Sequence, residues 1–545
     1  MKDFKIINIF SIILLVFALL SSWFIEYYAF DKRMVTIDQI QHFHDMKKMY
    51  ESKIFPVVGT RFIANRIVDD YYTTPHVPGG IYYIFYTLFY KLSGESFLGA
   101  RFLNLIFSLF IVYVFLIWVY KRFDLLICSL ISALLLTNGY LVLAVTDFWN
   151  PNITLLFSFL FFIFLFEYID EKDEIDKRKN IIKLSAVIIF PILAVMAQGH
   201  FVTFFSMIPT LIVYLILTYK RTIKYILFWG IGVFISFLEY LPYIISEINS
   251  GFSNINKIFS LRSGFKSFGF PQIHSIFMYP TNEMSSFYGS GIRAIINFWI
   301  EEPMYLYGIL FLFLSLLFLL TSFIISIYFL IRKKENIKND NLKVLFVMFK
   351  IYLLFIPVTI IVYLASRSLN GSFHYLYSAF SMSFLPFFIF FMINENNIKN
   401  NKKILIAVFL LLFMNVISMI GQLTRYFDGY ENQYNYKDML TISKLISNDA
   451  DNNTIKIINL YRFAGHPYML RDFALTYKPE YAWKQSDDSD NVYILFDKSG
   501  ALRHDKNSIM ENIDYLNTNS YIIFTNKSLI LYKFTNDNLN IPNKF

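Results

Sequence analysis

Long apolar runs recur along most of the chain and constrain its fold more than any other feature. Each is close to the roughly 20 residues that a helix needs to cross a lipid bilayer. With 56% hydrophobic and 16% charged residues, the composition is one that a water-soluble protein of 545 residues would rarely have. The sequence therefore predicts an all-α polytopic membrane protein with about eleven transmembrane helices. The runs lie near Ile7–Tyr28, Phe97–Tyr120, Leu125–Val145, Ile153–Ile169, Ile181–Gln198, Val202–Tyr219, Ile226–Ile245, Met304–Ile331, Val344–Ala365, Tyr375–Ile393 and Ile404–Ile420.

Two apolar segments allow a second interpretation. The N-terminal run resembles a signal peptide, but it is long enough to span a bilayer and no small-residue cleavage site follows it, so we expect a retained first helix. Ile81–Tyr90 fits a short or interfacial helix in the first external loop.

The only cysteine, Cys128, lies inside an apolar run. An intramolecular disulfide is therefore impossible, and a packing role is favoured.

The Lys and Arg residues of the short loops predict the orientation in the membrane. Basic clusters follow every second span, in YKRFD, EKDEIDKRKNIIK, YKRTIKY, IRKKENIKNDNLK and ENNIKNNKK. Because basic loops stay in the cytoplasm, we expect a multi-pass protein of the cell inner (cytoplasmic) membrane with a cytoplasmic N-terminus. The net charge of +9 then reflects loops that face anionic membrane lipids. The basic residues form no patch typical of nucleic-acid binding.

Three long segments lie on the external face in this topology, at about residues 29–96, 246–303 and 424–545. From Asp428 on, the sequence is rich in Asn, Asp and Lys and contains the strand-like runs TIKIINLY, NVYILF, SYIIFT and SLILYKF. We therefore expect a transmembrane domain over residues 1–425 and a small extracytoplasmic α/β domain over residues 426–545.

All eight histidines fall on the predicted external side, at positions 42, 44, 76, 200, 274, 374, 466 and 504. Histidine is common at membrane interfaces and in loops, so this distribution has an ordinary explanation. However, His76, His200 and His374 each adjoin an apolar segment, and this favours a shared site at the membrane boundary.

In the first external segment, acidic and histidine side chains recur with helical spacing. Asp38, His42 and Asp45 would lie on one stripe of a helix, beside an apolar stripe that includes Ile40 and Phe43. An amphipathic surface helix with solvated acids would explain this pattern. A carboxylate so close to the membrane is also a candidate base, because partial desolvation raises its pKa toward neutrality.

Two further external hairpins carry polar residues. In LAVTDFWNPNITLLF, Asp147 precedes an Asn-Pro helix start. Asp147 or Asn150 could therefore cap that helix, and this role is compatible with a place in a site. In MAQGHFVTFF, Gln198 and His200 have no charged neighbours. Polar residues at a membrane boundary are either hydrogen-bonded within the structure or functional.

In their order along the chain, these segments resemble a known family, the C-type (GT-C) membrane glycosyltransferases of the dolichyl-phosphate-mannose protein mannosyltransferase and aminoarabinose-transferase type. The family has an Asp-Glu-x-x-Tyr-like helix in the first external loop and then a Pro-rich H-x-P-P-l-y-Y segment that leads to y-k-l-f-G. DQIQHFHDMKKMYESKIF and TPHVPGGIYYIFYTLFYKLSGES are similar to these motifs in order and spacing. FWNPNITLLFSFLFFIF, QGHF and LPYIISEINSGFSN resemble a bacterial branch, and the resemblance covers about residues 1–390.

The resemblance implies a GT-C fold and transfer of a sugar from a polyprenyl-phosphate donor to an envelope glycan, lipid or protein acceptor, with inversion at the anomeric carbon. It gives Asp38 the role of general base and matches Asp147 to a second acid near the donor. It places His76 where relatives have a carboxylate or a metal ligand, so His76 is expected to help shape the reaction centre as a third catalytic residue. A divalent metal ion is a candidate cofactor. Gln39 replaces the second acid of the family's pair, and Gly79 replaces its second proline.

Donor binding is assigned to polar residues of the same face. Basic groups would stabilise the departing phosphate, whose low basicity makes a strong general acid unnecessary. Basic residues on external loops can also simply be solvated. The candidates for donor binding are Arg61, Arg66, Gln198, His200, Arg262 and Arg367.

Two other functions fit a chain of this kind. A transporter or flippase of a lipid-linked sugar also needs many spans, but it should carry ionisable residues near the middle of the bilayer. Here the acids and histidines gather at one face, and Glu239 and Lys350 are the nearest to intramembrane charges. A non-catalytic sensor would bind a ligand with its external tail, which lacks a recognised nucleophile or metal-ligand spacing.

Overall fold

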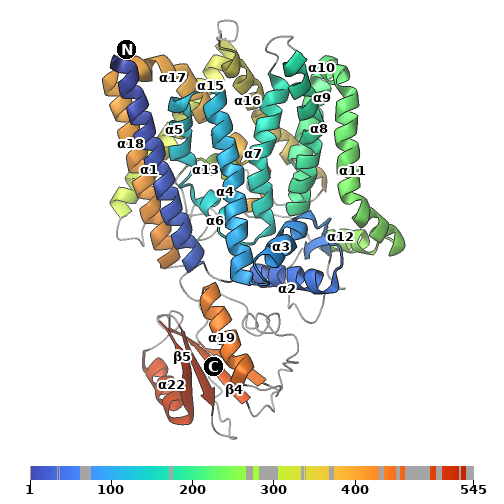
Figure 1. The fold of residues 1–545 in the computed structure, drawn as a ribbon, viewed down its shortest axis with the longest axis vertical. Helices are drawn as coiled ribbons and strands as arrows, with labels where there is room; N and C mark the ends of the chain where they lie inside the picture. Colours follow the sequence, from blue (N-terminus) through green and yellow to red (C-terminus); the bar gives the residue numbers. More distant parts are fainter. Residues whose placement is uncertain are drawn as a thin grey trace.

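The computed structural model describes most of the chain. Its long helices form one bundle, and Figure 1 shows a small sheet domain beyond one end of this bundle and the N-terminus at the other end. The described residues are 2–33, 35, 37–61, 75–170, 176–264, 274–281, 305–332, 337, 339–366, 373–428, 435–449, 455–460, 491–498, 506–526 and 529–534.

In the described part of the chain, eight helices are long and apolar enough to cross a membrane, and a ninth span results if one bent pair of helices counts as one. The prediction of an all-α polytopic membrane domain is thereby confirmed. The remaining predicted spans are not continuous helices. The eight helices are α1 (Lys2–Lys32), α4 (Phe97–Arg122), α7 (Asn150–Ile169), α8 (Asp176–Gly199), α11 (Ile226–Asn249), α15 (Tyr305–Arg332), α16 (Asp340–Ser366) and α18 (Lys402–Tyr426).

The predicted span Leu125–Val145 is broken into α5 (Leu125–Leu135) and α6 (Gly139–Val145), which meet at an angle of 78°. Asn138 causes a new helix to start, because its side chain accepts hydrogen bonds from the first backbone N–H groups of α6. Its Nδ2 also donates to the backbone oxygen of Tyr279, at 2.6 Å. Part of the second long external segment therefore packs inside the bundle.

The predicted spans Val202–Tyr219 and Tyr375–Ile393 both begin as 3-10 helix. Serine side chains join the two breaks to each other and to α7. The hydroxyl oxygens of Ser206 and Ser378 are 3.3 Å apart, and the Ser381 hydroxyl donates to the backbone oxygen of Ser158 at 2.7 Å. The elements are η1 (Phe201–Phe205), α9 (Met207–Leu217), η4 (Phe373–Ala379), η5 (Ser381–Phe384) and α17 (Leu385–Asn400).

Helix α7 is the most enclosed of the eight spans. Of its apolar window, 83% is buried, against 17% for α11 and α15. It packs against α4, α6 and α8, and also against η4. Any group at the start of α7 therefore lies on a rigid support, which is what a functional site requires.

Short elements cover the end of the bundle from which α7 begins. Strands β1 and β2 pair antiparallel, and Arg61 lies opposite His76. On α2, Ile40, Phe43 and Met46 are buried, as the predicted apolar stripe requires. The alternative of solvated acids on this helix is wrong for Asp45, which is 3% exposed. The elements are α2 (Ile37–Ser52), β1 (Val58–Arg61), β2 (His76–Pro78), α3 (Ile81–Leu92) and α12 (Ser253–Gly264).

The opposite end of the bundle carries basic residues that were predicted to share one side of the membrane. Arg122 and Arg178 both pair with Asp170, and Arg178 also pairs with Glu167. Arg221 donates to the backbone oxygen of Ile169 at 3.2 Å. Residues from three of the predicted basic loops therefore meet at the end of α7, on the same side as the N-terminus (Figure 1).

The C-terminal part folds as the predicted small α/β unit, and all four strand-like runs are strands. The strand order is β3-β4-β6-β5, with β3 parallel to β4 and the other pairs antiparallel. On β4, Tyr493 and Leu495 belong to the apolar cluster of α19, whereas Ile494 and Phe496 belong to that of α22. The elements are α19 (Tyr436–Asp449), β3 (Ile455–Leu460), β4 (Asn491–Asp497), α22 (Lys506–Asn519), β5 (Ser520–Thr525) and β6 (Leu529–Phe534).

Candidate active site

Asp38 lies in the first turn of α2 and is partly exposed. The indole Nε1 of Trp149 donates a hydrogen bond to Asp38 Oδ2, at 3.2 Å. Burial raises the pKa of the Asp38 carboxyl above its ordinary value, and the nearby Asp147 charge raises it further, whereas the hydrogen bond from Trp149 lowers it. The side chain is therefore oriented by one donor and is only partly buried as a residue, and a general base needs contact with its substrate.

A chain of hydrogen bonds fixes α2 relative to α3 and α7. His42 Nε2 accepts from the backbone N–H of Asn150 at 3.3 Å, and His42 Nδ1 lies 3.1 Å from the Tyr83 hydroxyl. Tyr83 in turn donates to Asp45 Oδ2 at 2.8 Å. With Nε2 accepting, a neutral imidazole carries its proton on Nδ1 and donates it to Tyr83.

The protonation states of this chain follow from burial. Desolvation lowers the pKa of His42 to about 3, so the imidazole is neutral at physiological pH. Desolvation raises the pKa of Asp45 to about 6, although the hydrogen bond from Tyr83 and the charge of Arg61 oppose this shift. The buried stripe of α2 therefore holds the helix in place, while Asp38 at its start remains partly exposed.

Asp147 is fully buried between two arginines. Arg33 Nε lies 3.1 Å from Asp147 Oδ2, and Arg101 Nε lies 3.6 Å from Oδ1. Oδ1 also accepts hydrogen bonds from the Tyr436 hydroxyl at 2.5 Å and from the backbone N–H of Phe148 at 2.8 Å. Its negative charge is thus neutralised within the protein, and the side chain anchors the loop that precedes α7.

The interpretation of Asp147 or Asn150 as a helix cap is wrong. Trp149 is the residue at the N-cap of α7, and no side chain caps this end. Asn150 is already helical, and its Nδ2 donates to the backbone oxygen of Gly199 at 2.6 Å. The side chain of Asn150 therefore ties the start of α7 to the end of α8.

Four partly exposed aromatic rings extend the site away from Asp38. The ring centroids of Trp149 and His374 are 4.4 Å apart, those of His374 and His200 are 5.2 Å apart, and those of His200 and Tyr375 are 4.9 Å apart. Burial lowers the pKa of His200 to about 4. Burial and the neighbouring His200 both lower the pKa of His374. The two imidazoles are neutral and can donate or accept hydrogen bonds.

The Pro- and Gly-rich segment around His76 is held by two other helices. The backbone N–H of His76 donates to Asn254 Oδ1 at 2.7 Å, and Asn254 Nδ2 donates back to the His76 oxygen at 3.0 Å. At the other end of the segment, the backbone N–H of Ile81 donates to Gln198 Oε1 at 3.0 Å. His76 faces Arg61 across the two strands. Gln198 therefore has a defined structural role here.

Replacing Gly79 by Ala should destabilise this segment. Gly79 has a φ of +79°, and a Cβ added there would lie 2.5 Å from Gln198 Oε1. Backbone strain of this kind costs about 1–3 kcal/mol, and the clash would displace Gln198 from Ile81. Gly94→Ala is the matched control, because its φ is +69° but nothing lies within 4 Å of its added Cβ. We expect a larger fall in melting temperature for Gly79→Ala. Equal falls would show that only the backbone strain matters.

The structure brings some of the predicted site residues together. Asp38 accepts a hydrogen bond from Trp149, which lies in the same loop as Asp147, and Arg61 lies opposite His76 in the strand pair. Of the three histidines that adjoin apolar segments, His200 and His374 are in contact, whereas His76 lies on the strand pair. Arg66 and Arg367 lie outside the described residues, and Arg262 lies on α12 with its side chain outside the description.

Several residues of the site were not predicted from the sequence. Arg101 had a usable signal, because a charged residue within an apolar run is rare unless it is paired. Trp149 belongs to the FWNPN motif, but nothing in the sequence connects its indole with Asp38. Arg33, Tyr83 and Tyr436 have no comparable signal, because their partners are distant in the chain.

The described residues do not fit the divalent metal ion that the resemblance made a candidate. Among them, no group of three or more His, Cys, Asp and Glu side chains is arranged to hold a metal ion. Asp147 has two guanidinium groups beside it instead. The positive charge at this point of the site therefore belongs to Arg33 and Arg101.

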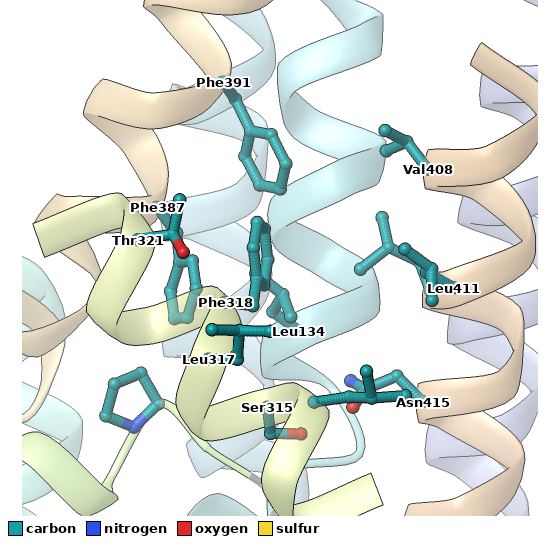
Figure 2. Close-up of a pocket in the computed structure, with 13 residues that line it drawn as sticks. Leu134, Ser315, Leu317, Phe318, Thr321, Phe387, Phe391, Val408, Leu411 and Asn415 are labelled. Carbon is teal, nitrogen blue, oxygen red and sulfur yellow. The ribbon is translucent and has the colours of Figure 1, made fainter. Parts of the chain in front are cut away.

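An apolar cavity of about 280 Å³ lies away from these residues, between α15, α17 and α18 (Figure 2). Phe318, Phe387, Phe391 and Leu411 are among the residues that line it. None of its lining side chains is titratable, and none belongs to the predicted site. It is therefore no candidate for the chemistry.

Comparisons with known proteins give similarities among solved structures. No protein-family model matches the chain, and no curated protein matches it. ArnT from Cupriavidus metallidurans in the apo state is similar with 11% identity and a TM-score of 0.46, over 95% of this chain and 97% of that chain. The same protein bound to undecaprenyl phosphate has 12% identity and a TM-score of 0.47, over 96% and 98%. The oligosaccharyltransferase from Archaeoglobus fulgidus in the apo form has 12% identity and a TM-score of 0.44, over 98% and 75%.

Proposed function

We propose that this chain is a GT-C-type membrane glycosyltransferase, which transfers a sugar from a polyprenyl-phosphate donor to an envelope glycan, lipid or protein acceptor. The observation that carries the proposal is the state of Asp38. Asp38 is a partly exposed residue whose carboxylate is oriented by the indole of Trp149, and it lies at the start of a helix with one buried face at one end of a membrane bundle. A base in this position can act on an acceptor in water while the donor's tail stays in lipid.

In the proposed step, the Asp38 carboxylate removes the proton from an acceptor hydroxyl. The acceptor oxygen then attacks the anomeric carbon of the donor in line with the bond to the phosphate. The bond between the anomeric carbon and the phosphate oxygen breaks, and the polyprenyl phosphate leaves with the electron pair. Configuration at the anomeric carbon is inverted, and the proton remains on Asp38 until it is lost to water.

Donor recognition is proposed for Arg61 and for the histidines that adjoin Trp149. Arg61 is 4% exposed and close enough to His44 and Asp45 for its charge to affect both pKa values. Asp45 is seven residues from Asp38, or about 10 Å along the helix. Arg61 would stabilise the leaving phosphate, and the neutral imidazoles of His200 and His374 would hydrogen-bond to the sugar.

The proposed arrangement in the cell follows the charge distribution of the loops. The end of the bundle that carries Arg122 and Arg178 would face the cytoplasm of a cell with an inner membrane, and the site would face outward. The helical domain over residues 1–425 would hold the donor. The α/β domain over residues 426–545 would then lie outside the membrane, beside the site.

The function can be tested by mass spectrometry of envelope glycans and polyprenyl-phosphate sugars in a strain that lacks the protein. The proposal expects an accumulated lipid-linked donor together with a truncated glycan, and these two would name the sugar and the acceptor. The full-length protein in lipid nanodiscs should also release polyprenyl phosphate from that donor. A flippase would instead move the intact lipid-linked sugar across a vesicle membrane, and release of no phosphate would contradict the proposal.

The pH dependence of kcat/KM should report Asp38. The carboxylate is active when ionised, so activity is present above its pKa and is lost as the pH falls through that value. Because the pKa is raised, the loss should begin at a higher pH than for a solvated aspartate. Trp149→Phe removes the hydrogen bond that lowers this pKa, so its acid limb should shift to higher pH. Trp118→Phe is the control, because Trp118 donates to Glu167 at the opposite end of the bundle. An unshifted limb in Trp149→Phe would argue against Asp38 as the titrating base.

A further inference from the structure

The C-terminal α/β unit places a tyrosine in the interior of the membrane domain. Tyr436, the first residue of α19, is 1% exposed. Its hydroxyl donates to Asp147 Oδ1 at 2.5 Å. The guanidinium carbon of Arg101 lies 4.0 Å from the centre of its ring, and the ring of Phe97 lies 5.3 Å away. The two parts of the chain are therefore in direct contact here, because the ring and the hydroxyl of Tyr436 both have partners in the membrane domain.

The same contact leads to the proposed base through a short loop. Tyr436 binds Asp147, and two residues later Trp149 donates to Asp38. The backbone between them is held at several points. The backbone N–H of Phe148 donates to Asp147 Oδ1, and Asn152 Nδ2 donates to the Asp147 oxygen at 3.0 Å. A shift of the Asp147 side chain would therefore move the indole that orients Asp38.

A second contact confines α19 from the outside. Lys437 forms an ion pair with Asp31 at the end of α1. Figure 1 shows α19 between the helix bundle and the sheet. Buried residues further along α19, Met439 and Ile442, belong to the same apolar cluster as Phe97 and Phe148. The first turn of α19 is thus packed into the site end of the bundle.

We infer that Tyr436 is a positioning residue for the proposed base, so that the C-terminal unit completes the active site through the loop from Asp147 to Trp149. The inference rests on the proposed function, in which Asp38 is the base. It makes the C-terminal unit a part of the site, and a chain that ends before Tyr436 should lose transfer even where it still binds the donor.

The test is the full-length Tyr436→Phe variant in lipid nanodiscs. The ring stays beneath Arg101, so the fold should persist, and only the hydrogen bond to Asp147 is removed. Because a misplacement of about 1 Å at a reacting group can cost about 10²-fold, we expect kcat to fall about tenfold with little change in the donor KM. Tyr532→Phe is the matched control, because Tyr532 is a buried tyrosine on the side of the sheet that packs against α22.

Two readouts separate positioning from a general loss of structure. If the indole of Trp149 is displaced, the acid limb of kcat/KM should move to higher pH in Tyr436→Phe, as in Trp149→Phe. The double variant should then resemble Trp149→Phe alone. Besides burial, the groups that affect the pKa of Asp38 are Trp149, through its hydrogen bond, and the Asp147 carboxylate, through its charge. A fall in kcat without any shift of the acid limb would overturn the inference.

Hydrogen–deuterium exchange supplies a readout that needs no activity. Within the loop, the backbone N–H of Phe148 is bonded to the Asp147 side chain and that of Asn152 to the Trp149 oxygen. Peptides over residues 146–152 should therefore exchange at least about tenfold faster in Tyr436→Phe than in Tyr532→Phe, if the loop opens locally. Unchanged exchange in these peptides would overturn the inference. If the wild-type protein transfers no sugar, the proposed function fails, while faster exchange would still show that Tyr436 holds the loop.

Discussion

Replacing Asp38 by Asn should abolish sugar transfer while the protein still folds and inserts. Loss of a general base typically slows a reaction by about 10²- to 10⁴-fold, and the asparagine keeps the shape of the side chain and can still accept from Trp149. Stability should not fall. Burial raises the pKa of this carboxyl, which means that the folded protein disfavours its ionised form, and the substitution removes that charge.

The measurement is the initial rate of transfer by the purified full-length variant, together with its melting temperature. Glu51→Gln is the matched control. Glu51 lies on the same helix, but its side chain is 53% exposed and pairs with Lys47. We expect Glu51→Gln to keep the wild-type rate. If Asp38→Asn retained transfer, the assignment of Asp38 as the base would be wrong. If Glu51→Gln lost the rate equally, the loss would come from a disturbance of the whole α2 helix.

Features that depend on one segment at a time could be predicted from the sequence. Eight of the apolar runs form continuous spans because length and hydropathy decide membrane insertion locally. The four strands of the C-terminal unit follow from short β-branched and aromatic runs such as NVYILF. The buried stripe on α2, with Ile40 and Phe43, follows from helical spacing. Each of these patterns is complete within a few turns of chain.

Features that depend on distant partners could not be predicted. The break between α5 and α6 needs Asn138, whose side chain binds the backbone of Tyr279 from a separate loop. The neutral state of His42 depends on burial by α3 and α7. A pattern within one segment contains no information about contacts with distant segments. Only an unusual residue, such as Arg101 in an apolar run, indicates locally that such a contact exists.

The two acids of the site were assigned related roles from the sequence, but their surroundings give them different ones. Asp38 has one donor and is partly exposed, whereas Asp147 is fully buried among Arg33, Arg101 and Tyr436. A catalytic base must exchange protons with substrate, and Asp147 has no exposed surface for this. We therefore expect Asp38→Asn to lose activity and keep its stability, whereas a variant of Asp147 should lose stability.

Asp147→Ala should destabilise the protein strongly. It leaves Arg33 and Arg101 buried beside each other without the carboxylate, and breaking a buried ion pair from one side costs about 3–5 kcal/mol. The free energy of unfolding should fall by that amount, and the melting temperature with it. Asp340→Asn is the control, because Asp340 is 44% exposed and pairs with Lys343 at the surface. Its effect should stay below about 1 kcal/mol.

A double variant makes the reason for that loss testable. Adding Arg101→Met to Asp147→Ala removes one of the two positive charges that lose the Asp147 carboxylate and fills its space with an apolar side chain. The double variant should therefore be more stable than Asp147→Ala alone, which is the opposite of what two independent losses would give. If Asp147→Ala instead kept the wild-type melting temperature and lost transfer, Asp147 would act in the chemistry, and its role as the anchor of the Trp149 loop would be wrong.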